Sequence, residues 1–278
     1  MEISRFWDYI RPTEAEMAAR DAVIRQTQTI IREASPEAKS EIFGSQRTGL
    51  ILATSDLDLR FFKDLDETTD QKKAPRYKDR KEILKSLRAL HSVFDANPDY
   101  ILCHLRHARY PLISMQHKDS GLDVQIVCAN DTGHSRNVMQ EYLSKHKDLA
   151  ALFSVVKIMF DIRGLSDVFR GGVGSYSLFM MVVASLELWG QPIHWNGRGD
   201  PFGVKKKYGD YHKSSAGAKL LHFLEFYSAF DPKWNAIAVQ PPKVYRKILM
   251  DEEATKLAKF NIEKDPVGFA SSCVRKHY

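Results

Sequence analysis

A glycine-serine turn precedes two closely spaced aspartates in the stretch Phe43-Gly-Ser-Gln-Arg-Thr-Gly-Leu-Ile-Leu-Ala-Thr-Ser-Asp-Leu-Asp-Leu59. Apolar and polar residues alternate at the end of this stretch and in the two residues after it: Leu57, Leu59 and Phe61 are apolar, and Asp56, Asp58 and Arg60 are charged. This two-residue period predicts a β-strand with one wet face. Both carboxylates of the aspartate pair leave that face together. Taken alone, such a pair is also common at a solvated strand edge.

A third aspartate, Asp123, stands on a second predicted strand over residues 122–128. The apolar residues of this strand face the core, namely Leu122, Val124, Ile126 and Cys128. Three acids can therefore converge at one edge of a sheet. Carboxylate oxygens are the ligands that Mg²⁺ takes, and two such ions held by aspartates promote in-line attack of a hydroxyl on a phosphate.

The turn before the acids supplies groups that suit a phosphate. Backbone N–H groups at Gly44-Ser45, with the serine hydroxyl, can receive the oxygens of a triphosphate, as backbone concavities do for anions generally. Ser45 could equally do no more than close a turn.

The remaining pattern predicts a mixed sheet followed by helices. A capping box, Thr13 to Glu16, begins a helix with an apolar stripe. A charged stretch over 63–80 reads as an exposed loop. The sheet unit continues with a helix around 83–94 and strands over 100–105, 112–116 and 122–128. Later helices are expected over 138–146, 149–163, 175–189 and 218–230, with an irregular segment over 190–213.

Composition is that of a folded protein with a basic surface. Of 278 residues, 41 are Lys or Arg and 35 are Asp or Glu, a formal charge of +6 that favours polyanionic partners such as nucleic acid or nucleotide phosphates. The longest apolar run, 177–188, is shorter than the roughly 20 residues that cross a bilayer, so no membrane span is predicted. The three cysteines are far apart and form no C-x-x-C pair, which indicates a reducing, intracellular setting.

Two other groups of side chains have a simpler interpretation. Cys103, His104, His107 and His117 could be assembled into a zinc site, but no second C-x-x-C or H-x-x-x-H accompanies them, so we interpret them as structural. The basic residues Lys72, Lys73, Arg76, Lys78, Arg80 and Lys81 could follow an RNA backbone, although a solvated helix start explains them as well.

The stretch 43–59 closely resembles the nucleotidyltransferase signature of the DNA polymerase β superfamily. More narrowly, it is similar to noncanonical poly(A) polymerases and terminal uridylyltransferases. Further motifs follow in the family's order: Ser120-Gly-Leu-Asp-Val-Gln-Ile-Val127, Phe153-Ser-Val-Val-Lys-Ile-Met-Phe160 and Gly171-Gly-Val-Gly-Ser-Tyr-Ser-Leu178. The N-terminal helix resembles the one that precedes the catalytic domain in nuclear poly(A) polymerases of surveillance complexes.

The resemblance implies a role for each matching residue. Asp56, Asp58 and Asp123 would be the catalytic metal ligands, for two Mg²⁺ or Mn²⁺ ions. The nucleotide-binding residues would be Gly44 and Ser45 at the phosphates, Asn137 at the ribose, Lys157 and Ser175 at the triphosphate, and Tyr176 against the base. Asn137 could instead be a helix N-cap. Some relatives carry a second lysine one turn after the first; here Asp161 occupies that position, and Lys205, Lys206 or Arg163 could substitute for it.

The resemblance also implies the domain plan and activity. We expect an α+β, bilobed fold: residues 1–38 form an N-terminal helix on the helical domain, 39–135 a small mixed-sheet catalytic domain, and 136–278 a helical central domain with a nucleotide-recognition loop. The expected activity is template-independent addition of AMP from ATP to an RNA 3′ end. A terminal uridylyltransferase, a non-catalytic RNA-binding or scaffold relative, and a transferase acting on a small molecule or protein are the alternatives.

Nucleotide choice, partner and compartment are finer expectations. In uridylyltransferase relatives a histidine of the recognition loop helps to select uracil, and 240–247 contains none, which favours ATP over UTP. The compact length predicts no appended RNA-recognition motif or zinc knuckle. Target choice is therefore expected to need an RNA-binding partner protein. The nucleus is the expected compartment, with the mitochondrion and cytoplasm as alternatives.

Overall fold

The computed structural model describes residues 2–63, 77–107, 111–128, 133–189 and 210–247. They form two compact units. One is Ile10–Val138, and the other combines Met1–Tyr9 with Met139–Tyr278. Lys205, Lys206, Cys273 and most of the charged stretch 63–80 lie outside the described residues.

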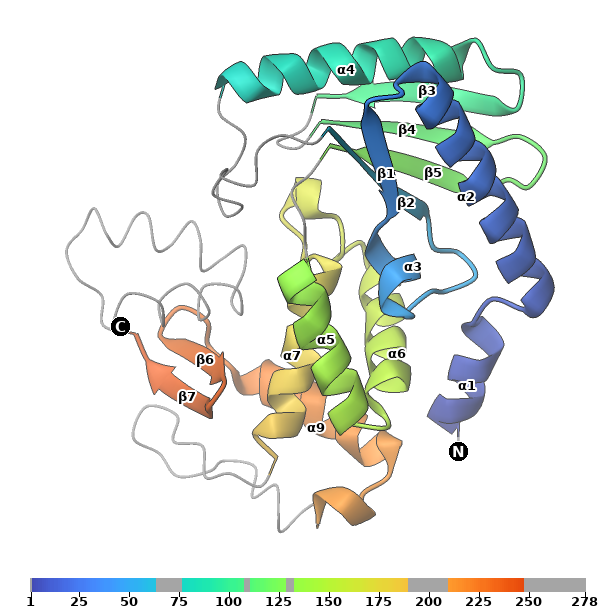
Figure 1. Cartoon of the computed structure of the whole chain (residues 1–278). Helices are drawn as coiled ribbons and strands as arrows, with labels where there is room; N and C mark the ends of the chain where they lie inside the picture. Colours follow the sequence, from blue (N-terminus) through green and yellow to red (C-terminus); the bar gives the residue numbers. More distant parts are fainter. Residues whose placement is uncertain (1, 64–76, 108–110, 129–132, 190–209, 248–278) are drawn as a thin grey trace. The chain divides into compact units, whose positions relative to one another are not determined.

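The first unit is built on a mixed five-stranded sheet (Figure 1). Its strands, in spatial order, are β1 (Ala38–Ile42), β2 (Leu57–Lys63), β5 (Asp123–Val127), β4 (Leu112–His117) and β3 (Tyr100–Arg106). Only β2 and β5 run parallel; the other neighbours are antiparallel. The α+β fold and the mixed sheet are thus confirmed, with three predicted strands matching to within a residue or two.

Two helices cover the apolar face of this sheet. The helix α2 (Glu14–Ala34) begins with the predicted capping box, in which Thr13 and Glu16 exchange hydrogen bonds, and α4 (Tyr77–Asp95) follows β2 in the chain. One core holds side chains of both helices and of the sheet: Val23, Ile24, Ile31, Leu57, Leu59, Phe61, Leu87, Leu90, Phe94, Ile113, Met115, Val124 and Ile126. The opposite face is therefore the one on which the polar residues of β2 and β5 stand.

The packing of α2 differs from the expectation for residues 1–38. We expected this helix on the helical domain, but its Val23, Ile24 and Ile31 pack against the sheet, and only Met1–Tyr9 groups with the other unit. An apolar stripe along a helix indicates that this face packs against other apolar residues. It does not indicate which element of the fold supplies them.

The edge strand β1 was not predicted. Its sequence, Ala-Lys-Ser-Glu-Ile, has few apolar residues, and it becomes a strand by pairing with β2, from Ala38 opposite Lys63 to Ile42 opposite Leu59. Cross-strand hydrogen bonds, which sequence periodicity does not report, fix this segment.

The second unit is mainly helical. Its helices include α6 (Leu149–Ile162), α7 (Ser175–Glu187) and α9 (Ala216–Ala229), close to the predicted bounds, while α5 (Gly133–Lys145) starts five residues before the predicted one and crosses from the first unit. The helix α1 (Glu2–Ile10) and the 3₁₀ turns at Val168–Arg170 and Tyr211–Lys213 complete the described helical segments.

A β-hairpin interrupts the predicted helical domain. The strands β6 (Asn235–Val239) and β7 (Pro242–Arg246) pair antiparallel, and Ile237 joins a core with Ala184, Leu188, Phe226 and Phe230. The mainly helical stretch expected over 136–278 thus also contains two short strands that were not predicted. The strand β6 buries three consecutive residues, 235–237, so it shows no two-residue period, and buried contacts with α7 and α9 stabilise it instead.

Candidate nucleotidyl-transfer site

The two aspartates of the sequence motif lie at the start of β2. Asp58 is the second residue of the strand and Asp56 immediately precedes it. Leu57 and Leu59 are buried in the core, so Asp58 is on the polar side of the sheet. The acids are close enough for the negative charge of Asp56 to bear on Asp58.

The carboxylate of Asp58 is packed against the backbone of Gly44. The main-chain N–H of Phe43 donates to the carbonyl oxygen of Asp58 at 2.8 Å, which joins the turn to β2. Gly44 begins the short helix α3 (Gly44–Thr48) with a positive φ of 62°, and a Cβ atom at this position would lie 2.1 Å from Oδ2 of Asp58. A glycine is therefore required by conformation and by space.

Burial gives Asp58 unusual acid–base behaviour. Loss of solvent around the carboxyl, with the charge of Asp56 as the second cause, raises the pKa of Asp58 to about 6. Asp56 and Asp58 are partly buried carboxylates that repel each other, so negative charge is concentrated at the start of β2. This concentration of charge favours protonation or a cation.

The third predicted acid, Asp123, is at the start of β5. The parallel register pairs Leu57 with Val124 and Asp58 with Gln125, so Asp56 and Asp123 each stand one residue before the first pair. Asp123 is exposed and accepts a hydrogen bond from Nε2 of Gln116 at 3.2 Å. Its place on the neighbouring strand agrees with convergence of the acids, and its role as a ligand stays a prediction.

Gln125 contacts the pair directly and was not singled out by sequence reasoning. Its Nε2 donates to Oδ2 of Asp56 at 2.5 Å. The strand period could have identified it, since Gln125 follows Asp123 by two residues and shares its face.

The donor set suits a hard divalent cation. Asp56 and Asp58 offer carboxylate oxygens, and the absence of a side chain at Gly44 leaves the space that the Asp58 carboxylate occupies. Within the described ranges, no three His, Cys, Asp or Glu side chains gather as a ready-made metal site, and this includes the cysteine and histidines around 103–117. A cation would thus bind to Asp56 and Asp58. Its remaining ligands would come from the substrate, or from Asp123 if that side chain moved toward the pair.

The other predicted nucleotide-binding residues of the first unit are Ser45 and Asn137. Ser45, partly buried, is the second residue of α3, where its carbonyl oxygen accepts from the N–H of Gly49. Asn137 is exposed and lies inside α5, four residues after its start, so the N-cap alternative is wrong.

The second unit carries Lys157, Ser175 and Tyr176. Lys157 of α6 forms an ion pair with Asp161 one turn on, Nζ to Oδ2 at 3.1 Å. Ser175 is the first residue of α7, and Tyr176, the second, is 41% exposed. The two compact units are described separately, so the joining of these residues with the acids stays a prediction.

A tight glycine turn sets the start of α7. The N–H of Gly172 donates to the carbonyl of Asp167, and a Cβ atom on Gly172 would lie 2.4 Å from the carbonyl oxygen of Leu165. The residues that present Ser175 and Tyr176 are thus held by backbone contacts that only glycine permits.

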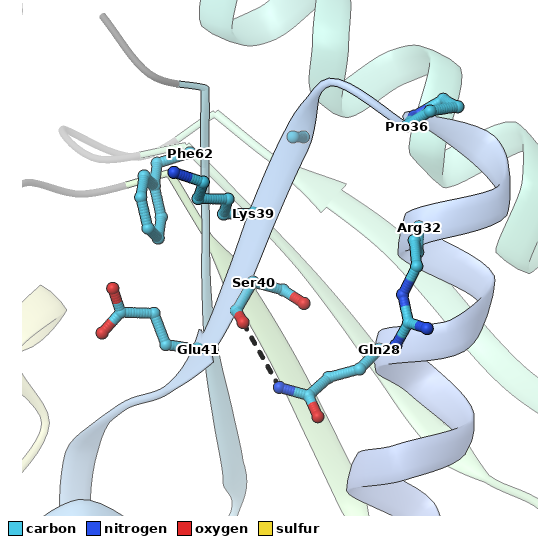
Figure 2. A pocket seen from close by; sticks show the side chains of 8 residues that line it. Gln28, Arg32, Pro36, Lys39, Ser40, Glu41 and Phe62 are labelled. Atoms are coloured by element: carbon cyan, nitrogen blue, oxygen red, sulfur yellow. Dashed lines mark hydrogen bonds between the residues drawn. The ribbon is translucent and has the colours of Figure 1, made fainter.

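A hollow on the first unit does not include the three aspartates in its lining. It runs beside β1 and is lined by Gln28 and Arg32 of α2, Pro36, Ala38, Lys39, Ser40, Glu41 and Phe62 (Figure 2). Gln28 crosses it and donates from Nε2 to the carbonyl oxygen of Ser40 at 3.3 Å. None of the predicted site residues lines it.

Comparison with known proteins settles the family. The model of the central palm domain of mitochondrial-like poly(A) RNA polymerases matches residues 1–144, more than half of the chain. The chain belongs to this poly(A) RNA polymerase family. The matched part contains the Gly44 turn and all three aspartates, so the resemblance inferred from the motifs is confirmed.

Individual members of the family are more distant. The chain is 29% identical over 189 residues to poly(A) RNA polymerase CID14 of Cryptococcus neoformans, covering 67% of this chain and 23% of that protein. It is 26% identical to the inactive noncanonical poly(A) RNA polymerase protein Trf4-2 of Drosophila melanogaster, covering 67% and 43%. The chain thus spans less than half the length of these two relatives.

Solved structures agree on the fold. The polymerase core of TRAMP, described as an RNA surveillance complex, superimposes with a TM-score of 0.72 at 21% identity, covering 98% of this chain and 83% of that one. The Cid1 poly(U) polymerase with bound MgGTP gives a TM-score of 0.63 at 19% identity, covering 88% and 79%. At these identities the likeness shows a shared fold.

No helix in the described part of the chain has the length and apolar character of a membrane span. Cys103 and Cys128 are free thiols.

Proposed function

We propose that the chain is a template-independent RNA 3′-end nucleotidyltransferase that adds AMP from ATP. The observation that carries this proposal is the aspartate pair packed against the Gly44 turn, in a chain of the poly(A) RNA polymerase family. The family includes uridylyltransferase-like and inactive relatives by name, so the nucleotide and the activity are proposed for this chain.

Asp56, Asp58 and Asp123 would hold two Mg²⁺ or Mn²⁺ ions. Bound there, the ions would neutralise phosphate charge and favour ionisation of the primer hydroxyl. Asp58 must lose its proton to serve as a ligand. With a pKa of about 6, it is largely ionised at neutral pH, and a bound cation favours the ionised form further.

The neighbouring residues would position the nucleotide. The Gly44 backbone and the Ser45 hydroxyl would receive triphosphate oxygens, as would Lys157 and Ser175. Asn137 would contact the ribose. Positioning and charge stabilisation supply most of the catalysis in phosphoryl transfer, because little covalent chemistry is left for the protein.

Tyr176 would stack on the incoming base. Its ring is exposed at the start of α7, as a stacking platform requires. Stacking tolerates any base, so discrimination of ATP from UTP would need further contacts.

The substrate would be an RNA 3′ end, and an RNA-binding partner protein would supply target choice. The name of the TRAMP core, an assembly, favours such a partner. An intracellular compartment is proposed, with the nucleus preferred over mitochondrion and cytoplasm; the names of relatives mention both of the latter.

Extension of a labelled oligo(A) primer with Mg²⁺ and each ribonucleotide separately tests this function. We expect extension with ATP above that with UTP. Preferred use of UTP would replace the adenylyl assignment by uridylyl transfer. Absence of Mg²⁺-dependent binding of any nucleotide would favour a scaffold relative, and labelling of a protein or metabolite instead of RNA would reveal a different acceptor.

A further inference from the structure

Arg20 of α2 is a buried cation in the interior of the first unit. Its side chain is 1% exposed and is among the largest fully buried side chains. A guanidinium that is removed from water requires compensating hydrogen bonds or charges. Its contacts therefore indicate what the protein gains from placing it there.

The side-chain hydrogen bonds of Arg20 in the described part of the chain all go to one turn. Nη2 donates to the carbonyl oxygens of Ala53 and Ser55, at 2.7 Å each, and more weakly to that of Leu52 at 3.4 Å. The Ser55 carbonyl belongs to the peptide bond that enters Asp56. The cation thus holds the segment from which the aspartate pair begins.

The turn is also closed by its own hydrogen bonds. The N–H of Ser55 donates to the carbonyl of Leu52, and the N–H of Leu52 donates to Oγ of Ser55, both at 3.0 Å. Several carbonyls converge on one side of such a turn, and their negative ends repel unless a donor lies among them. Arg20 is that donor, anchored in a 21-residue helix that packs on the sheet.

The charge of Arg20 also bears on the acids. The negative charge of Asp56 attracts the guanidinium of Arg20 and repels the carboxylate of Asp58. Nε and Nη1 of Arg20 are buried with no hydrogen-bond partner in the described part of the chain. Burial of a guanidinium with some donors unpaired is costly, so the bonds of Nη2 to the turn and the attraction of Asp56 are the contacts that compensate for it.

We propose that Arg20 is a positioning residue for the aspartate pair: it fixes the Leu52–Ser55 turn and so sets the place at which Asp56 and Asp58 receive a divalent cation. This inference rests on the proposed function in one respect, that these two acids bind the cation. Arg20 itself contacts neither substrate nor metal in this account.

The test measures binding of Mn²⁺ to the full chain by electron paramagnetic resonance, without nucleotide or primer. Arg20→Met removes the donor and the charge, and we expect Mn²⁺ affinity to fall by about tenfold or more, as is usual when a group supporting a metal ligand is lost. Arg20→Lys keeps the charge with a shorter side chain and should give an intermediate affinity. It also carries the test if Arg20→Met does not fold.

Thr27→Val provides a matched control. Thr27 is buried on the same helix, and its hydroxyl bonds with that of Tyr100 on β3, which two strands separate from β2. Its loss should lower the melting temperature while Mn²⁺ affinity stays within about twofold, because no ligand-bearing segment depends on it.

The outcomes separate this proposal from the proposed function. Arg20 variants that fold and bind Mn²⁺ as the wild type does would overturn the role of Arg20 alone. So would an equal loss of affinity in Thr27→Val. A wild-type chain that binds no Mn²⁺ would overturn the proposed metal site, and this inference with it.

Discussion

The Asp58 carboxylate occupies the space that a side chain at residue 44 would fill: a Cβ atom on Gly44 would lie 2.1 Å from Oδ2 of Asp58. The turn and the acid therefore fit together only if residue 44 is glycine. The positive φ of 62° at Gly44 imposes the same requirement independently. Two parts of the sequence motif that are 14 residues apart are thus one structural unit.

Replacing Gly44 should test this unit. Gly44→Ala should cost about 1–2 kcal/mol for the left-handed backbone and roughly 1–3 kcal/mol more to displace the Asp58 carboxylate. Urea unfolding measures the sum, and Mg²⁺-dependent primer extension should fall as well.

Gly49→Ala is the control for Gly44→Ala. Gly49 has a φ of 78°, and a Cβ atom there would meet no other part of the described chain within 4 Å, so this substitution carries the conformational cost alone. Equal destabilisation by the two substitutions would contradict the contact between residue 44 and Asp58.

The raised pKa of Asp58 predicts how stability depends on pH in metal-free protein. A folded-state pKa of about 6, against an ordinary value of 3.8, means that the folded form holds the proton more tightly. The stability from this group is complete below about pH 4 and is lost as pH rises through about 6. Asp58→Asn should therefore be more stable than wild type at pH 7–8 in EDTA, by on the order of 1–3 kcal/mol.

Thermal unfolding from pH 4 to 8 checks this difference, with Asp21→Asn, at an exposed position of α2, as the control. Mg²⁺ should stabilise the wild type at pH 8 and not Asp58→Asn. If the difference in melting temperature between wild type and Asp58→Asn does not change with pH, the charge of Asp58 is not its cause.

Loss of the Lys157–Asp161 ion pair should increase the affinity for the nucleotide. Asp161 holds the ammonium group that is proposed for the triphosphate, at 3.1 Å. The pair is partly exposed, so its free energy is about 0–1 kcal/mol. Asp161→Asn should then lower KM for ATP by up to roughly fivefold with kcat little changed. The same substitution made in Lys157→Met should have no such effect, and an equal effect in both backgrounds would exclude Lys157 as its route.

If the base stacks on Tyr176, removal of the aromatic ring should reduce the affinity for ATP. Tyr176→Ala should weaken ATP binding by roughly 1–3 kcal/mol, whereas Tyr176→Phe keeps the aromatic face and most of the affinity. Steady-state kinetics of primer extension separates them. Similar KM values for the two variants would argue against base stacking.

The sequence predicted well those features that repeat along the chain. Alternation identified β2 and β5, and the capping box identified the start of α2. Features fixed by distant partners were missed. The strand β1 depends on its pairing with β2, and the hairpin β6–β7 depends on its packing against α7 and α9. The helix α2 packs against the sheet and not, as expected, against the helical domain.

The site shows the same division. Asp56, Asp58 and Gly44 are juxtaposed as the motif predicts. Arg20 and Gln125 were missed, because an arginine on a capped helix and a glutamine on a strand look like surface residues. Only the tertiary structure shows that one binds the turn before Asp56 and the other binds its carboxylate.

The most direct test of the central claim is extension of a labelled oligo(A) primer by the wild-type chain and by Asp56→Asn and Asp58→Asn, with ATP and Mg²⁺, alongside RNA binding by the same proteins. The account predicts extension by the wild type, loss of extension in both variants, and RNA binding that all three retain. Extension by Asp56→Asn or Asp58→Asn at the wild-type rate would contradict it.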